Sequence, residues 1–338
     1  MKYFRFIPSC VASIAFLTAC QPAEDGLQPL SDPESPETVS EAPLPEIADE
    51  EPLPPIQRAA LPETMDCVRQ AGGLLIATHR GGPAYGYPEN AIATLDYALS
   101  KGAHIMEVDV AESRDGQLFL MHDRTLGRTT TGRGPVADAD WDEISQLKLV
   151  DELGTVTAFE PPTLETALAW AVETGAILEL DRKETTSFRN IIEAVRETRA
   201  EDNVIIITYT DEEALQVAKL APELMMTAGI GNRDHEARMM EAGLNPDMLI
   251  AWTGTNRPSP GKWQGLASKG IESAFGTLGR KGERLDDQYW ADGDPSEYEA
   301  FVEGGLVLLA TDEPYKLLAL DGPIGEAINT ADRECFGG

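Results

Sequence analysis

The sequence predicts an α/β barrel, because nine short apolar runs alternate with patterns typical of amphipathic helices, and one pair of runs is too close together for a crossover. The apolar runs are 74–78, 105–110, 118–121, 176–181, 204–208, 224–228, 248–252, 271–275 and 306–309. The helical patterns include 90–100, 164–174, 188–198, 211–220, 235–242 and 295–302.

The third apolar run follows the second so closely that the two must be antiparallel. A parallel crossover needs a dozen or more residues, so this hairpin lies outside the repeat and eight β/α units remain, the number that closes a (β/α)8 TIM barrel. Between the two runs, Asp115-Gly116 favours a two-residue turn with both residues at positive φ. That turn would pair Asp109 directly with His122, with Glu107 on the same strand face.

Residues 123–162 are too many for an ordinary barrel loop. We therefore expect a small inserted lobe over the mouth of the barrel, with a short helical patch at 141–147. The lobe could select substrates, or it could be simple loop decoration.

Residues suited to chemistry gather where barrel strands end, which is where TIM barrels build their active sites. They include His79, Glu107, Asp109 and Asp181. Carboxylates offer hard oxygen ligands, imidazoles exchange protons near neutral pH, and Arg80 beside two glycines suggests contact with an anion. The set predicts metal-assisted phosphoryl chemistry, although His122 could merely form a salt bridge with Asp109.

Residues 1–19 resemble a bacterial lipoprotein signal peptide. Lys2 and Arg5 precede an apolar stretch at 7–17 that is too short to span a bilayer comfortably, and Leu-Thr-Ala-Cys ends at Cys20. We expect removal of the leader and lipidation of Cys20, with an ordinary secretory leader as the alternative. The mature protein is then exported, and the lipid anchors it to a bacterial membrane on the periplasmic side.

Residues 20–62 are expected to be a disordered tether that follows the lipidated cysteine. Residues 21–60 contain nine prolines and ten acidic residues but one basic residue, Arg58. Such a segment cannot bury enough apolar surface to offset its ordering entropy. The acidity of the tether fits a solvated spacer and argues against nucleic acid as a partner. The formal net charge of the whole chain is -31. Residues 63–338 form the predicted catalytic domain.

Two cysteines remain near the ends of that domain. Cys10 leaves with the leader and Cys20 is expected to be lipidated, so Cys67 and Cys335 could form a disulfide in an oxidising compartment. Two unpaired buried thiols are the alternative.

Seven short motifs resemble those of the glycerophosphodiester phosphodiesterase family. In family order they are His79-Arg80-Gly81, Pro88-Glu89-Asn90, Glu107-Val108-Asp109, His122-Asp123, Thr131-Gly132-Arg133-Gly134, Pro162-Thr163-Leu164 and Thr311-Asp312-Glu313-Pro314. The resemblance implies a barrel with an inserted lobe and one divalent cation, Ca²⁺ or Mg²⁺, held by carboxylates. It also implies hydrolysis of a small glycerophosphodiester to glycerol phosphate and an alcohol.

The resemblance also implies roles for individual residues. Glu107 and Asp109 are implied metal ligands, His79 and His122 an acid–base pair, and Arg80 a phosphate-binding residue. A cyclic phosphate formed by attack of a glycerol hydroxyl is allowed by the same resemblance.

The third carboxylate is expected at residues 178–183, Leu-Glu-Leu-Asp-Arg-Lys, where the family usually shows Glu-x-Lys. Alignment on the lysine makes Asp181 the metal ligand and Lys183 a cation that faces the phosphate, and we prefer this alignment. Alignment on the glutamate makes Glu179 the ligand instead.

Two further positions have competing interpretations. The family often shows a tryptophan in the seventh barrel strand, whereas this chain has Trp252 in the sixth; Trp252 could bind substrate or could cap the barrel core. Glu89 and Asn90 could belong to the site or could cap the helix that starts at residue 91.

Three other functions compete with glycerophosphodiester hydrolysis. The first is release of the headgroup from intact lipids, as by lysophospholipase D or sphingomyelinase D. The second is a lipoprotein that binds phosphodiesters without turnover, and the third is a scaffold or adhesion protein.

Overall fold

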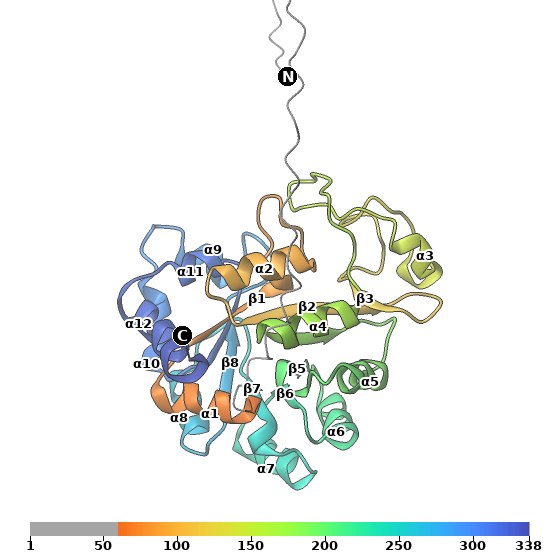
Figure 1. The fold of residues 1–338 in the computed structure, drawn as a ribbon. Coiled ribbons are helices and arrows are strands. Elements are labelled where there is room, and N and C mark those ends of the chain that lie inside the picture. Colours follow the sequence, from red (N-terminus) through yellow and green to blue (C-terminus); the bar gives the residue numbers. More distant parts are fainter. Residues whose placement is uncertain (1–59, 338) are drawn as a thin grey trace, which may run out of the picture. The chain divides into compact units, whose positions relative to one another are not determined.

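The computed structural model describes residues 60–337, which fold around a closed barrel of eight parallel strands (Figure 1). The barrel strands are β1 (Leu75–Thr78), β2 (Ile105–Glu112), β4 (Ile177–Arg182), β5 (Val204–Ile207), β6 (Met225–Gly229), β7 (Leu249–Trp252), β8 (Glu272–Gly276) and β9 (Leu308–Thr311). β1 pairs with both β2 and β9, which closes the sheet. The predicted TIM barrel is confirmed.

Most of the helices surround the barrel, whereas the first covers one end of it and the third lies in the inserted lobe. The helices are α1 (Leu61–Ala71), α2 (Ile92–Ser100), α3 (Trp141–Ile144), α4 (Leu164–Thr174), α5 (Phe188–Thr198), α6 (Asp211–Leu220), α7 (Arg233–Glu241), α8 (Pro260–Ala267), α9 (Leu285–Tyr289), α10 (Glu299–Glu303), α11 (Pro314–Leu318) and α12 (Gly322–Ala331). The predicted bounds of α4, α5 and α6 match because Thr163, Ser187 and Thr210 each accept a backbone N–H at the helix start. The predicted helix 295–302 is divided into a 3-10 turn, Ser296–Tyr298, and α10.

The strand β3 (Leu118–Leu120) pairs antiparallel with the end of β2. The predicted two-residue turn is wrong, because Ser113 N–H donates to Gln117 O at 2.9 Å and residues 114–116 form a three-residue loop. Gly116 has φ +94°, whereas Asp115 is not among the residues at positive φ. The glycine provides the left-handed residue that a three-residue hairpin needs.

The longer loop shifts the register of the hairpin by one residue. Val110 lies opposite Leu120, and Met121 N–H donates to Asp109 O at 2.9 Å. The predicted pairing of Asp109 with His122 is therefore wrong in register, since Met121 takes the position opposite Asp109.

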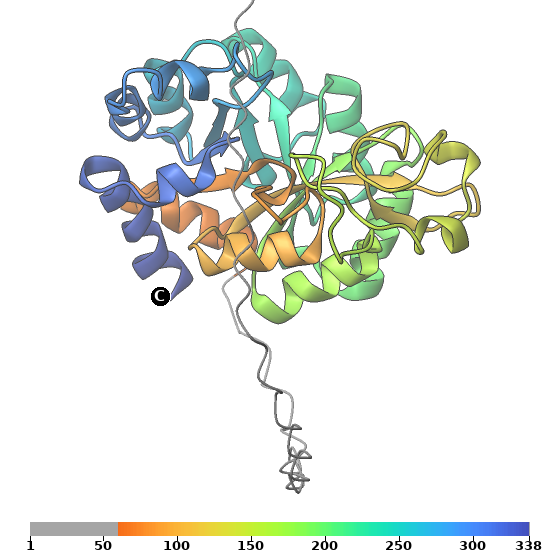
Figure 2. The same cartoon turned by 90° about the horizontal axis from the view of Figure 1, so that it is seen from above.

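The segment predicted as an inserted lobe packs around a small core of its own. This core joins lobe residues to β2 and β3 and consists of Ala111, Phe119, Met121, Leu126, Val136, Ala139 and Ile144. Both views of the barrel show the lobe and α3 on the side where β3 lies, away from α10 and α12 (Figures 1 and 2). The extended hairpin thus supports the lobe beside the carboxyl ends of the strands.

The opposite end of the barrel is covered by α1. Leu61, Met65 and Val68 of this helix pack on apolar residues at the starts of the strands, among them Leu75, Ile105, Ile177, Ile205, Met225 and Ile250. A disulfide joins Cys67 in α1 to Cys335 in the last helical turn, so the predicted pairing is present in the structure. We refer to this end as the barrel floor, and to the end with the polar residues as the barrel mouth.

The predicted leader, Cys20 and most of the predicted tether lie outside the described residues. Within residues 60–337, no helix has both the length and the apolar composition needed to cross a membrane.

Candidate active site

Three acidic side chains meet at the barrel mouth. Glu107 and Asp109 lie on β2, Asp181 lies on β4, and the parallel register sets Asp109 beside Asp181. One ligand oxygen from each carboxylate lies within 4.8 Å of the other two, and all three side chains are buried. The predicted ligand set therefore forms one compact group, which we call the acidic cluster.

The chemistry of the acidic cluster fits a divalent cation. Burial, followed by the charges of Asp109 and Asp181, raises the pKa of Glu107 well above its ordinary value. Asp181 Oδ1 is buried and has no hydrogen-bond partner among the described residues. A cation held by these oxygens would offset the repulsion and the missing hydrogen bond, and hard oxygen ligands suit Ca²⁺ and Mg²⁺.

Glu179 lies deeper in the barrel, beside Glu107 in the register and outside the group of three. Burial, with a smaller effect from the charge of Asp181, raises the pKa of Glu179 to about 7. This arrangement favours Asp181 over Glu179 as the third ligand.

Lys183 provides positive charge beside the acidic cluster. Its Nζ lies 2.5 Å from Asp109 Oδ1 and 2.5 Å from Asp181 Oδ2. The hydroxyl of Tyr209 donates to the same Asp181 oxygen at 2.9 Å. Lys183 thus contacts the acidic cluster directly, and Tyr209 is a neighbour that the sequence did not indicate.

His79 follows β1 and is oriented by an acid from the other end of the chain. Its Nδ1 donates to Asp312 Oδ1 at 2.6 Å, which leaves Nε2 available for chemistry. Asp312 also accepts hydrogen bonds from Gly279 N–H and Arg284. Although burial alone would raise the pKa of Asp312, these donors, with His79 foremost, hold it below its ordinary value. Asp312 belongs to a motif quoted above, but its partner could not be read from the sequence.

His122 is oriented in the same way by its neighbour in the chain. Its Nδ1 donates to Asp123 Oδ1 at 2.8 Å. Arg128, from the lobe, binds both Asp123 and Glu89, and its hydrogen bonds are the main reason why the pKa of Asp123 is lowered. Although the hairpin register differs from the prediction, His122 lines the same cavity as Asp109.

Arg80 adopts a left-handed backbone conformation, φ 53°, beside the acidic cluster. Its Nη1 contacts Glu89 Oε2 at 3.2 Å, and its Nε is buried with no hydrogen-bond partner among the described residues. Nε lies 4.0 Å from Asp109 Oδ2, which is an ion pair without a hydrogen bond. A guanidinium N–H without a hydrogen bond can donate to an anion, which is consistent with the predicted contact to phosphate.

Asn90 belongs to the site and does not cap a helix. Its φ is 59°, the N-cap position of α2 is Ala91, and no side chain caps this helix. Asn90 Nδ2 donates to Asp109 Oδ2 at 2.7 Å, and Asp109 N–H donates to Asn90 Oδ1 at 2.9 Å. The alternative in which Glu89 and Asn90 merely cap the helix is therefore wrong, because Glu89 binds two arginines and Asn90 holds Asp109.

The acidic cluster and both histidines line one cavity of about 460 Å³, which we call the catalytic cavity. Its less polar wall includes Ile207, Trp252 and Leu278. The ring of Trp252 lies over Gly276, where a Cβ atom would come within 2.9 Å of it. Trp252 thus lines the catalytic cavity, as one interpretation expected. It also packs against the apolar core inside the barrel, as the other interpretation expected.

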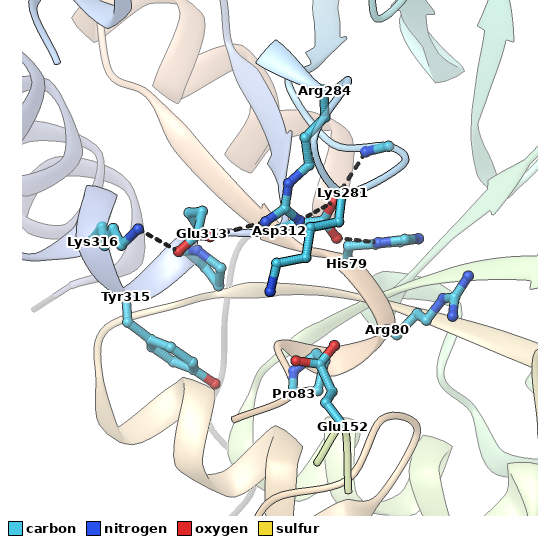
Figure 3. Close-up of a pocket in the computed structure, with 12 residues that line it drawn as sticks. His79, Arg80, Pro83, Glu152, Lys281, Arg284, Asp312, Glu313, Tyr315 and Lys316 are labelled. Carbon is cyan, nitrogen blue, oxygen red and sulfur yellow. Dashed lines mark hydrogen bonds and ion pairs between the residues drawn. The ribbon is translucent and has the colours of Figure 1, made fainter. Parts of the chain in front are cut away.

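A second cavity, of about 420 Å³, opens beside the first and shares His79 with it. Figure 3 shows Arg284 between Asp312 and Glu313. Lys281 reaches into the cavity from the same loop as Arg284, and Glu152 reaches in from the lobe. Because Glu152 comes from the lobe, the lobe contributes a side chain at the barrel mouth.

The barrel has a buried acidic cluster and two imidazoles bound to carboxylates at its mouth. These features define a class of TIM barrels suited to metal-assisted acid–base chemistry. Residues 79–244 match the Glycerophosphoryl diester phosphodiesterase family. The chain belongs to this family.

Two relatives and one solved structure illustrate the similarity. The chain is 28% identical to a Glycerophosphodiester phosphodiesterase of Caldanaerobacter subterraneus, over 73% of this chain and 97% of that protein. It is 30% identical to Bacillus subtilis YqiK over 44% of this chain, but spans only 63% of that protein. A Glycerophosphoryl diester phosphodiesterase structure from Parabacteroides distasonis has a TM-score of 0.67 and 24% identity, and covers 82% of this chain and 94% of its own.

Proposed function

We propose that the protein hydrolyses glycerophosphodiesters to glycerol phosphate and an alcohol, with a bound divalent cation. The observation that supports this most directly is the placement of two imidazoles, each bonded through Nδ1 to an aspartate, on one cavity with the acidic cluster. A protein that only binds phosphodiesters would not need two oriented proton carriers.

Glu107, Asp109 and Asp181 would hold the cation, either Ca²⁺ or Mg²⁺. When bound, such an ion polarises phosphoryl oxygens and lowers the pKa of bound water. Arg80, whose Nε donates no hydrogen bond to the described residues, and Lys183 would offset the remaining negative charge of the phosphate.

The two histidines would transfer the protons of the reaction. One imidazole accepts a proton at Nε2 from the attacking hydroxyl group as the new P–O bond forms. The other donates a proton to the leaving oxygen as the bond to the alcohol breaks. Asp312 and Asp123 keep Nδ1 protonated, so each ring presents Nε2 to the catalytic cavity. Each such proton transfer contributes typically about 10²- to 10⁴-fold.

Hydrolysis of a panel of glycerophosphodiesters tests the proposal. We expect activity to fall to background after chelation and to return with Ca²⁺ or Mg²⁺. His79→Ala and His122→Ala should each reduce kcat/KM by about 10²- to 10⁴-fold, whereas His235→Ala, a change at an exposed ion pair with Asp211, should not. If both catalytic-site variants stay within tenfold of the parent, the assignment fails.

Headgroup release from intact lysophospholipids is the second candidate. The apolar wall formed by Ile207, Trp252 and Leu278 favours it, because such a wall could receive part of an acyl chain. Separate assays with glycerophosphocholine and lysophosphatidylcholine distinguish the two, since the preferred substrate should show the larger kcat/KM. Trp252→Ala should impair the lipid reaction more strongly if an acyl chain lies there.

We also propose export and membrane anchoring through a lipid on Cys20. The Cys67–Cys335 disulfide supports export, because disulfides persist in oxidising compartments. Labelling cells with a radioactive fatty acid should mark the parent protein and not Cys20→Ser. A labelled Cys20→Ser protein would contradict the proposal.

A further inference from the structure

The second cavity has no role in the acid–base chemistry proposed above. It shares His79 with the catalytic cavity, and its wall is formed by the loops after β1, β8 and β9 together with Glu152 of the lobe (Figure 3). A phosphodiester has two ester arms. A phosphate bound at the acidic cluster could therefore extend one arm into each cavity.

Two opposite charges in this second cavity are unpaired. Arg284 neutralises Asp312 and Glu313 at 2.7 and 2.9 Å, and the other charged residues of the wall also have partners. Glu152 and Lys281, in contrast, form no hydrogen bond or ion pair with any residue between 60 and 337. Both side chains point into the cavity in Figure 3, from different loops. Their charges are thus available to a ligand.

The nearby carboxylates affect Glu152 more strongly than the nearby cations do. Burial, followed by the charges of Glu89 and Asp312, raises the pKa of Glu152, and the opposing effects of Lys281 and Arg284 are smaller. A carboxylate repelled by nearby carboxylates is stabilised by a cation placed next to it.

The loop that bears Glu152 is held in place by its neighbour. Asp151 is buried, and its carboxylate accepts N–H groups from Leu153 at 3.0 Å, Thr155 at 2.8 Å and Gly86 at 3.2 Å. The bond to Gly86 ties the lobe to the loop after β1, where Arg80 lies. Glu152 is therefore presented to the second cavity by a fixed turn.

We propose that the second cavity binds the leaving alcohol of the substrate and that Glu152 selects headgroups with an ammonium group, such as choline or ethanolamine. This inference rests on the proposed function and adds a substrate class to it. Lys281, on the other side of the cavity, should reduce the preference for such headgroups, because its ammonium group repels a cation.

Substrate competition in the full-length protein tests the inference. The ratio of kcat/KM for glycerophosphocholine to that for glycerophosphoglycerol should fall about five- to tenfold in Glu152→Gln, and further in Glu152→Lys. Lys281→Gln should change the ratio in the opposite direction. Glu143→Gln, at an exposed lobe position outside both cavities, is the matched control and should leave the ratio unchanged. Ratios within twofold of the parent in both Glu152 variants would overturn the inference.

Equilibrium binding separates this inference from the proposed hydrolysis. Calorimetry in His122→Ala, a residue outside the second cavity, should show the same change in the ratio of Kd values when Glu152→Gln is added. If no glycerophosphodiester is hydrolysed but the Kd ratio shifts, the subsite stands and the hydrolase assignment falls. If hydrolysis occurs and neither ratio moves, the subsite falls. Absence of both hydrolysis and binding overturns both.

Discussion

The two ends of the barrel are built from different kinds of side chain. At the floor, the starts of the strands present apolar residues that α1 covers, and a disulfide fastens α1 to the end of the described chain. At the mouth, the ends of the same strands present buried acids that repel one another. β2 shows the change within one strand, from Ile105 at the floor to Asp109 at the mouth.

This contrast indicates how stability and chemistry are divided in the molecule. Apolar burial at the floor stabilises the fold, whereas crowded carboxylates at the mouth cost stability unless a cation or an ammonium group compensates them. We therefore expect variants of the acidic cluster to lose activity with little loss of stability, and floor variants to behave in the opposite way.

The largest expected effect is at Asp181. Asp181→Asn should reduce kcat/KM on the order of 10³-fold, because a cation bound there supplies several kcal/mol of charge stabilisation. Urea unfolding in the presence of chelator should show little loss of stability, because relief of the repulsion among the acids offsets the weakened ion pair with Lys183. Glu179→Gln is the matched comparison and should lose far less activity. Equal losses in the two variants would mean that the third ligand has been misassigned.

Removal of the disulfide tests the role of the barrel floor. Cys67→Ser with Cys335→Ser should lower the free energy of unfolding by about 2–4 kcal/mol, because the unfolded chain is no longer cross-linked. Activity measured well below the unfolding temperature should remain within twofold of the parent. A large loss of kcat in this variant would show that the floor and the mouth are coupled.

Asp312, at the barrel mouth, should contribute both to activity and to a stability that depends on pH. Asp312→Asn should reduce kcat/KM by about 10- to 100-fold, because His79 loses the partner that orients it. The folded-state pKa of Asp312 is lowered, so its stabilisation is present above the ordinary value of 3.8 and is lost as the pH falls through and below it.

The variant should accordingly be less stable than the parent by about 2 kcal/mol near pH 7. The difference should narrow when unfolding is measured at progressively lower pH below 4. A difference that stays constant down to the acid unfolding region would contradict this role of Asp312.

The smallest expected effect concerns the average charge. With a formal net charge of -31, the protein should repel anionic substrates at long range, although the field at the mouth is set by local groups. Raising the salt concentration should increase kcat/KM for glycerophosphoglycerol by about two- to threefold. Glycerophosphocholine, which has no net charge, should respond less. An equal change of kcat/KM with salt for the two substrates would indicate that local charges, and not the net charge, control how the substrate approaches the site.

The strands and several helices could be predicted because their signals are local. Nine apolar runs reappear as nine strands, and α4, α5 and α6 match their predicted bounds because each begins with a capping serine or threonine. The turn before β3 was predicted with one residue too few, since Asp115-Gly116 is compatible with both hairpin types.

The sequence by itself determined which residue types reach the barrel mouth, because strand alternation and strand ends follow from the apolar pattern. Glu107, Asp109 and Asp181 form one group for that reason. Only the tertiary structure decided which acid orients His79, since Asp312 follows the end of β9 and lies 233 residues later in the chain. Closure of the barrel sets β1 beside β9, but the local pattern does not show which side chains beyond the two strand ends then meet.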